Sequence, residues 1–226
     1  MKELKLALRS KRRLIRQGVL AYSRKHGRPF AWRAENRTPY QVLIAEVLLR
    51  RTTASAVARL YDNFLSQFPS VTELFRANEE IIRCVLTVVG LQRDRARLLK
   101  VMAAHLMTLH NGNIPTEIDE LRRVPGVGSY TARAVRAFAF NQRVGIVDSN
   151  VERVLRRVFN RCLSARGDLK ELEDAVDTLV PANHRAFNFG LLDLGSALCR
   201  GSNPRCEVCP LRRCCDYASK CGMPPG

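Results

Sequence analysis

Apolar residues recur at helical spacing along nearly the whole chain, and this pattern predicts an all-α protein. No stretch shows the sustained alternation of Val, Ile, Thr and aromatic residues that is typical of strands. With 226 residues, the chain is long enough for one large or two small hydrophobic cores. Short loops marked by Pro and Gly separate the expected helices, which lie near residues 3–25, 39–51, 54–67, 79–88, 92–110, 117–123, 129–140, 149–162, 168–180 and 184–198.

The expected helix 39–51 carries a single acidic residue in an apolar segment. Thr38 suits the N-cap, Pro39 the first helical position and Gln41 the capping box, so the start is well defined. The segment VLIAEVLL that follows is apolar on every face except at Glu46, so we expect the carboxyl group to be buried with the helix. Burial raises the pKa of a carboxyl group that has no cationic partner. Glu46 is therefore either an acid that holds a proton near neutral pH or a structural carboxyl bonded to a neighbouring helix end.

The segment 121–148 predicts two helices joined by a tight turn and followed by a carboxylate. Pro125 cannot continue a helix, while Gly126 and Gly128 permit positive φ and let a bulky anion approach the main chain. The second helix begins directly behind the turn, so its N–H groups and its dipole point towards the same place. The turn is either a phosphate-binding hairpin or an ordinary helix corner whose glycines serve close packing.

The formal net charge of +17 favours the phosphate-binding interpretation of this turn. The excess of basic residues runs along the whole chain, which makes a polyanion the expected partner. The basic residues are not segregated opposite one apolar face and no run of 18 apolar residues exists, so we expect DNA as the partner and no membrane. The basic N-terminus lacks the apolar core of a signal peptide, and we therefore expect a soluble, cytoplasmic protein. Arg50 and Arg51 give the helix 39–51 a basic tip that is either solvated or in contact with DNA.

Asp148 follows the apolar run 144–147 and directly precedes an expected helix. Aspartate, serine and asparagine are the usual N-caps in this place, so Asp148 is a helix cap on the simplest interpretation. The functional alternative is a carboxylate in a cleft between two helical units.

Six of the eight cysteines, Cys221 among them, lie in the last 28 residues, and such crowding in an unexported chain indicates a metal rather than disulfides. The spacing of four of them allows one metal centre, with Cys214 as an alternative to the last, and these four are Cys199, Cys206, Cys209 and Cys215. Tetrathiolate zinc and a four-iron, four-sulfur cluster both use four cysteines, and the ligand number does not separate them.

Three features together, LRRVPGVGSYTA, IVDSNVERV and the cysteine spacing, resemble the helix-hairpin-helix base-excision DNA glycosylases. The resemblance covers about residues 10–218 and is to the iron–sulfur branch, which includes endonuclease III and the adenine glycosylases. Within that branch, PFAWR and PYQVLIAEVLLRRTTA are most similar to the archaeal G·T mismatch thymine or uracil glycosylases. The resemblance implies two domains, a six-helix barrel at 34–147 and a [4Fe-4S] cluster domain formed by 1–33 together with 148–226, with the hairpin and Asp148 facing the cleft between them.

The resemblance also implies roles for individual residues, with double-stranded DNA containing a mismatch as the partner. Asp148 stabilises the positive charge that develops on the sugar, Glu46 assists the departing base, and Tyr130 borders the base that is flipped out of the duplex. DNA contact is expected from the turn and from the tip of helix 39–51, namely from Gly126, Val127, Gly128, Arg50 and Arg51.

Tyr130 separates the subfamilies in this resemblance. Endonuclease III has a lysine here that forms a Schiff base with the sugar, a reaction that tyrosine cannot perform. We therefore expect a monomeric, monofunctional glycosylase that removes thymine or uracil opposite guanine and leaves the abasic site to downstream processing enzymes. Adenine glycosylases usually have serine here and a further C-terminal domain, whereas this chain ends 11 residues after Cys215. An adenine glycosylase acting opposite guanine or 8-oxoguanine is the first alternative, and a non-catalytic DNA-binding hairpin module is the second.

Overall fold

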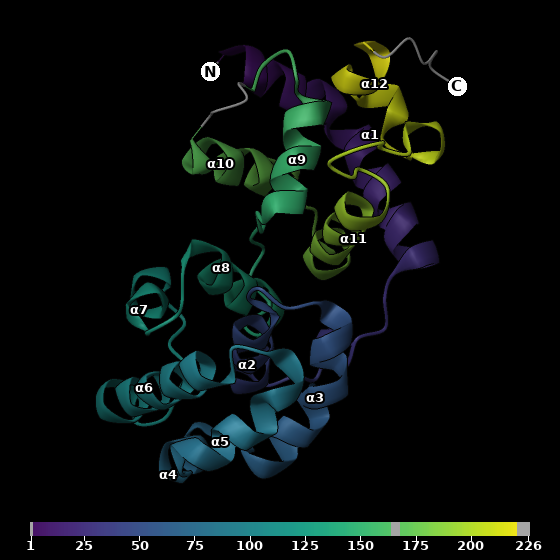
Figure 1. Cartoon of the computed structure of the whole chain (residues 1–226). Coiled ribbons are helices and arrows are strands. Elements are labelled where there is room, and N and C mark those ends of the chain that lie inside the picture. Colours follow the sequence, from purple (N-terminus) through teal and green to yellow (C-terminus); the bar gives the residue numbers. More distant parts are fainter. Residues whose placement is uncertain (1, 164–167, 221–226) are drawn as a thin grey trace. The chain divides into compact units, whose positions relative to one another are not determined.

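A computed structural model describes residues 2–163 and 168–220, and within these residues it contains twelve α-helices and no strand (Figure 1). The predicted all-α class is confirmed for this part of the chain. The chain divides into two compact units, Pro29–Gln142 and Met1–Arg28 with Arg143–Gly226. No helix among the described residues is long and apolar enough to cross a membrane.

The unit Pro29–Gln142 is built around helix α2, Pro39–Leu49. Every residue from 42 to 48 is buried, as a helix that is apolar on all sides requires. Helices α3 and α8 and the short 3-10 helix η1 pack against α2. The other elements of this unit are η1 (Ala31–Arg33), α3 (Ala54–Gln67), α4 (Val71–Arg76), α5 (Glu79–Val85), η2 (Leu86–Val89), α6 (Gln92–His110), α7 (Ile118–Arg123) and α8 (Ser129–Phe138).

The predicted start of α2 is confirmed, but its end lies two residues earlier than predicted. The Thr38 hydroxyl accepts the N–H of Gln41 at 3.3 Å, and the Gln41 side chain accepts the N–H of Thr38 at 3.1 Å, which completes the capping box. The helix stops at Leu49 because Arg51 has a φ of 54°, a left-handed conformation that a right-handed helix cannot include.

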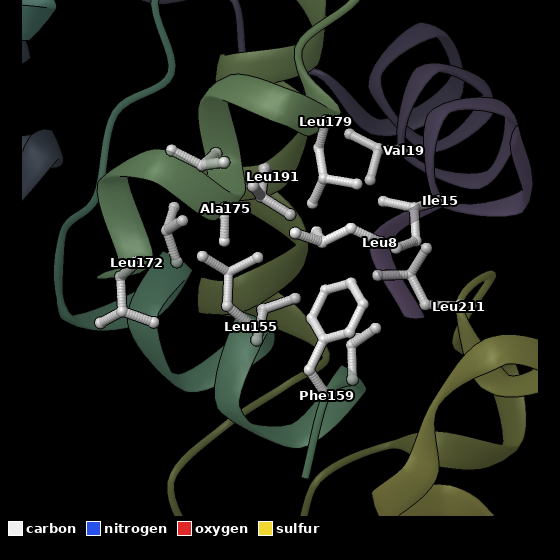
Figure 2. Packing of buried hydrophobic residues seen from close by; sticks show 14 of the residues in the cluster. Leu8, Ile15, Val19, Leu155, Phe159, Leu172, Ala175, Leu179, Leu191 and Leu211 are labelled. Atoms are coloured by element: carbon white, nitrogen blue, oxygen red, sulfur yellow. The ribbon is translucent and has the colours of Figure 1, made fainter. Parts of the chain in front are cut away.

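The second unit joins the N-terminal helix α1 (Lys2–His26) to the C-terminal part of the chain. Leu8, Ile15 and Val19 of α1 point into one apolar cluster with Phe159 and Leu191 (Figure 2). The other described elements of this unit are α9 (Ser149–Val158), α10 (Leu169–Leu179), α11 (His184–Ala197), η3 (Cys206–Val208), η4 (Arg212–Cys214) and α12 (Asp216–Lys220).

Two short helices, α4 and α12, were not predicted, and the predicted helix 79–88 is divided into α5 and η2. The signal for α4 was present in the sequence, because Ser70 and Glu73 have the spacing of a capping box. In the structure the Ser70 hydroxyl accepts the N–H of Thr72 at 3.1 Å and donates to the Glu73 carboxylate. Helix α8 ends at Phe138 rather than at residue 140, shortly before Asn141 takes a left-handed φ of 52°.

Candidate functional site

The predicted hairpin between α7 and α8 is present, and Gly126 forms its turn. Its φ of +84° lies in the region that favours glycine, as predicted. A Cβ atom at this position would lie 3.0 Å from both methyl groups of Leu98 in α6, so glycine also serves close packing. The turn is held by the N–H of Val127, which donates to the carbonyl of Val124 at 3.0 Å, while the Val127 side chain is buried.

Gly128 differs from Gly126, because it does not adopt the positive φ that glycine permits. Its φ of −93° and ψ of −176° are extended values that any residue adopts. No heavy atom lies within 4 Å of the position that a Cβ atom would take. Gly128 is the N-cap of α8 and brings no side chain over the helix N-terminus, so an anion has room to approach the backbone there. Tyr130 is half-buried in the first turn of the same helix.

The end of α2 lies against this turn. Arg50 donates from Nη1 to the carbonyl oxygen of Gly126 at 3.0 Å, so the basic tip and the hairpin are joined by a direct hydrogen bond. Arg50 and Arg51 also line one pocket together with Leu91, which precedes α6. Leu91 is 51% exposed and has a left-handed φ of 50°. The sequence analysis missed Leu91, because a leucine before an amphipathic helix is not distinguishable from a core residue by its spacing.

Glu46 is 6% exposed in the middle of α2, so its predicted burial is confirmed. It lies near enough to Tyr61 of α3 to affect its ionisation. Burial is the main cause that raises the pKa of Tyr61, and the negative charges of Asp62 and Glu46 raise it further, against the opposing effect of Arg37.

Asp148 caps helix α9, which confirms the simplest interpretation of this residue. Its Oδ1 accepts the N–H groups of Asn150 at 2.9 Å and Val151 at 2.8 Å, and its Oδ2 accepts from the Asn150 side chain at 2.8 Å. Both oxygens are therefore held, which fixes the plane of the carboxyl group. Because the residue is only partly buried, capping leaves part of the carboxylate accessible.

A chain of hydrogen bonds leads from Asp148 to the first cysteine of the predicted metal centre. Asn150 accepts with Oδ1 from Nη2 of Arg153 at 2.7 Å, and Arg153 donates from Nε to the carbonyl oxygen of Cys199 at 2.6 Å. Arg153 also donates to the carbonyl oxygen of Gly195 at 2.9 Å. The sequence analysis did not single out Asn150 or Arg153. The one sign in the sequence that these two side chains interact was their spacing of three residues, which places them on the same helix face.

The four predicted metal ligands, Cys199, Cys206, Cys209 and Cys215, line a single cavity. The atom-free space in this cavity is ≈ 370 Å³, open solvent included. In residues 2–163 and 168–220 no group of three or more His, Cys, Asp or Glu side chains is arranged to hold one metal ion. Four thiols around a common space nevertheless fit a group larger than a single ion. Cys221 lies outside the described residues.

Cys214, the alternative fourth ligand, is not part of the cavity lining. It is buried, and its thiol donates to the carbonyl oxygen of Leu211 at 3.3 Å. Burial raises the pKa of Cys209 to about 12 and the pKa of Cys214 to about 11. A bound cationic group is therefore needed to keep Cys209 deprotonated as a ligand.

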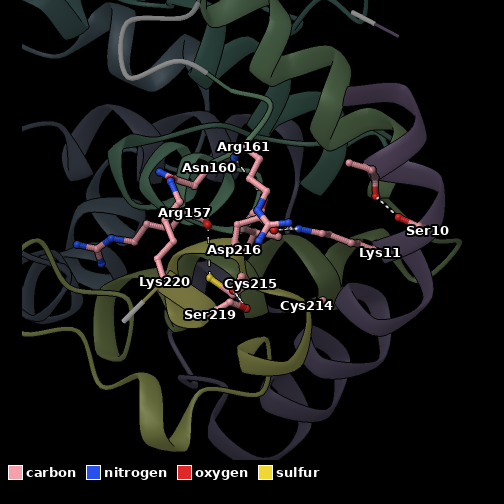
Figure 3. Close-up of polar contacts among 12 residues, drawn as sticks. Ser10, Lys11, Arg157, Asn160, Arg161, Cys214, Cys215, Asp216, Ser219 and Lys220 are labelled. Carbon is pink, nitrogen blue, oxygen red and sulfur yellow. Dashed lines mark hydrogen bonds and ion pairs between the residues drawn. The ribbon is translucent and has the colours of Figure 1, made fainter. Parts of the chain in front are cut away.

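Basic side chains, among them Lys11 and Arg157, lie around Cys215 (Figure 3). Arg157 donates from Nη1 to the Cys199 sulfur at 3.4 Å and to the Arg200 carbonyl oxygen at 2.6 Å, and its guanidinium group lies 4.8 Å from the centre of the Tyr217 ring. Lys11 of α1 forms an ion pair at 2.6 Å with Asp216, which directly follows Cys215. These contacts tie the cysteine segment to α1 and α9 and place positive charge beside the thiol groups.

A profile described as "HhH-GPD superfamily base excision DNA repair protein" matches residues 44–176. The thymine/uracil-DNA glycosylase of Methanothermobacter thermautotrophicus is 34% identical over 217 residues, which are 95% of this chain and 98% of the relative. That of Pyrobaculum aerophilum is 35% identical over 203 residues, covering 87% and 88% of the two chains. The adenine DNA glycosylase of Mycobacterium tuberculosis is 34% identical over 200 residues, but these are 65% of its length.

Comparison with solved structures indicates the same family. The structure of a thermostable thymine-DNA glycosylase matches with a TM-score of 0.88 and 34% identity, covering 95% of this chain and 100% of the other. Endonuclease III in a trapped covalent intermediate with DNA matches with a TM-score of 0.77 and 25% identity, covering 93% and 98%. The resemblance that the motifs indicated is thereby confirmed.

The two hairpin glycines should respond differently to alanine. Gly126→Ala should lower the free energy of unfolding by about 1–3 kcal/mol, because the methyl group meets Leu98 and the positive φ becomes strained. Gly128→Ala should cost only about 0.5 kcal/mol, because alanine is a poorer N-cap but nothing obstructs its methyl group. Urea unfolding of both variants measures the difference, and equal losses would contradict this account of the turn.

Proposed function

The chain belongs to the HhH-GPD superfamily of base excision DNA repair proteins, and from this premise we propose that it removes thymine or uracil opposite guanine. The observation that carries the proposal is similarity along nearly the whole length of two archaeal thymine/uracil-DNA glycosylases. The adenine glycosylase of similar identity extends well beyond the matched region.

We infer that the enzyme first rotates the mismatched nucleotide out of the base stack. This step costs a few kcal/mol and costs least at a mismatch, since a G·T or G·U wobble pair is already weakened. Arg51 and Leu91 line one exposed pocket, and an apolar side chain beside a basic one suits the space that the base leaves. The Gly126–Gly128 turn would hold the DNA backbone, where Gly128 leaves space for a phosphate.

Asp148 is the proposed catalytic carboxylate. Cleavage of the N-glycosidic bond builds positive charge on the sugar, and a carboxylate beside it stabilises this charge and orients the attacking water. Three hydrogen bonds from Asn150 and Val151 fix the Asp148 carboxyl group before the substrate arrives. Such preorganisation means that the group pays no reorganisation energy during the reaction.

Glu46 is proposed to donate a proton or a hydrogen bond to the departing base. A carboxyl group in buried surroundings holds its proton more strongly, which suits a general acid near neutral pH. Tyr130 would border the flipped pyrimidine from the first turn of α8. Because a phenol cannot form a Schiff base, we propose that the reaction ends with hydrolysis and an intact strand.

We propose that Cys199, Cys206, Cys209 and Cys215 hold a [4Fe-4S] cluster. The shared cavity suits a cluster, and the nearby side chains of Arg157, Arg205 and Arg212 suit the negative charge that four thiolate ligands bring to it. When bound, the cluster would link the four cysteines and so stabilise the segment after α11, and no redox turnover is implied. Arg200 and Arg205 in the loop between the first two cysteines add positive charge that a DNA backbone would meet.

The wild-type protein should release thymine and uracil from duplexes with G·T and G·U pairs. Strand breaks should appear only after alkali, because a monofunctional glycosylase leaves the sugar in place. A panel that also contains A·G, A opposite 8-oxoguanine and thymine glycol separates the alternatives. Release of adenine would favour the adenine glycosylase, strand breaks without alkali would contradict the monofunctional mechanism, and release of no base would favour a non-catalytic module.

Asp148→Asn should retain mismatch binding but lose base release by about 10²–10³-fold, since the neutral amide cannot stabilise the sugar cation. Asp168→Asn is the matched control, because Asp168 caps α10 through its bond to the N–H of Lys170. Single-turnover excision rates on G·U duplexes compare the two variants. If Asp148→Asn excises as fast as Asp168→Asn, Asp148 is only a helix cap.

The purified protein should be brown and contain about four iron atoms per chain. Cys209→Ser should lose the iron because it removes a residue of the cavity lining. Cys214→Ser should keep it, since the Cys214 thiol donates to Leu211 instead. Iron and zinc analysis of the three proteins is the measurement. Zinc in the wild type, or iron loss in Cys214→Ser alone, would contradict the assignment.

A further inference from the structure

Arg95 of α6 is a buried cation whose hydrogen-bonding capacity is completely used. It is 6% exposed, and each of the five N–H donors of its guanidinium group is matched by a bond to a neighbouring oxygen. Nη1 donates to the carbonyl oxygens of Val47 at 3.1 Å and Leu48 at 2.9 Å, and Nε donates to that of Gly90 at 3.2 Å. Nη2 donates to the Arg50 carbonyl oxygen and to the Thr52 hydroxyl.

These acceptors belong to two segments that are far apart in the sequence. One is the end of α2 with residues 50–52, and the other is the turn 89–91 before α6. Thr52 connects the same two segments a second time, because its hydroxyl lies 3.4 Å from the Val89 carbonyl oxygen. Val47 and Leu48 belong to the last turn of α2, where carbonyl groups lack partners within the helix.

The charge of Arg95 is stabilised by backbone dipoles, and among the described residues it forms no ion pair. The partial negative charge at a helix C-terminus favours a cation in this place. Burial, with a smaller contribution from the positive charge of Arg50, lowers the pKa of Arg95. Burial of the guanidinium group thus costs solvation free energy, while its hydrogen bonds hold several backbone carbonyl groups in place.

Both segments contain a residue in the left-handed region. Arg51, with a φ of 54°, lies between two acceptors of Arg95, and Leu91, with a φ of 50°, follows a third. Left-handed backbone is strained for residues other than glycine and persists only where the surroundings enforce it. Arg51 and Leu91 line the same pocket, and Arg95 is part of its lining.

We propose that Arg95 is a positioning residue that holds Arg51 and Leu91 in their strained conformations as one preformed pair for entry into the DNA duplex. The inference rests on the proposed function, since it concerns the step in which a base leaves the stack. If both side chains already have their bound conformation in the free protein, they lose little conformational entropy on binding. Less of the free energy gained from contact with DNA is then offset by this ordering cost. Without Arg95 the pair must become ordered at the moment of insertion.

Loss of Arg95 should therefore impair recognition of the mismatch more than general DNA affinity. The exposed basic residues that contact phosphates are unchanged, so affinity for a matched duplex should stay near the wild-type value. In Arg95→Met the ratio of the affinities for G·T and G·C duplexes should fall about tenfold. This is the change expected if one or two more side chains must become ordered on binding. Arg95→Lys should recover only part of this preference, because an ammonium group has three donors in place of five.

The experiment compares wild type, Arg95→Met, Arg95→Lys and the control Arg97→Met, which removes an exposed arginine from the same helix. Dissociation constants are measured for G·T and G·C duplexes, and 2-aminopurine beside the mismatch reports unstacking through its fluorescence. Arg95→Met should lose most of the fluorescence increase and Arg97→Met should keep it. Thr52→Val, which removes one acceptor of Arg95 and the contact with Val89, should show a smaller loss in the same direction.

Wild-type preference and fluorescence in both Arg95→Met and Thr52→Val would overturn the inference, as would equal losses in Arg97→Met. Should Arg95→Met fail to fold, Arg95→Lys and Thr52→Val decide by the same two measurements. Binding and fluorescence do not depend on base release. A wild type that excises nothing would therefore refute the proposed function, while the two binding measurements would still decide the role of Arg95.

Discussion

Burial of residues 42–48 of α2 on every side is the constraint on which the unit Pro29–Gln142 depends. Terminal N–H and C=O groups of a helix that are open to solvent can bond to water, but those that are buried must find protein partners. At the exposed N-terminus the Thr38 and Gln41 side chains form a capping box. At the buried C-terminus the partner is Arg95, a residue from another helix. Glu46 lies between these two ends, each of which is held by side-chain hydrogen bonds.

The local features of this site could be predicted from sequence because their causes are local. Capping of α2 follows from residues within one turn. The four cysteines proposed as ligands from their spacing line one cavity, while their role as ligands stays a prediction. The hairpin was predictable from Pro125 and Gly126 because the turn needs a residue with positive φ. The expected domain boundaries, by contrast, remain a prediction that came from the resemblance.

What could not be predicted depends on contacts between distant residues. Arg95 lies on a helix rich in arginine, and no local pattern shows which of them is buried against the end of α2. The end of α2 was misplaced for the same reason, since the left-handed Arg51 depends on contacts from α6. The sequence also does not show that Gly126 is needed for its positive φ while Gly128 leaves open space, because glycine serves both uses.

The discontinuous second unit has a consequence for the order of folding during synthesis. Pro29–Gln142 is contiguous, so it can fold as soon as its last residue leaves the ribosome. Helix α1 is made first, yet α11, against which it packs, comes near the end of the chain. Until then Leu8, Ile15 and Val19 of α1 lack their native partners. The apolar face of α1 therefore stays without its native partners while the unit that follows it folds.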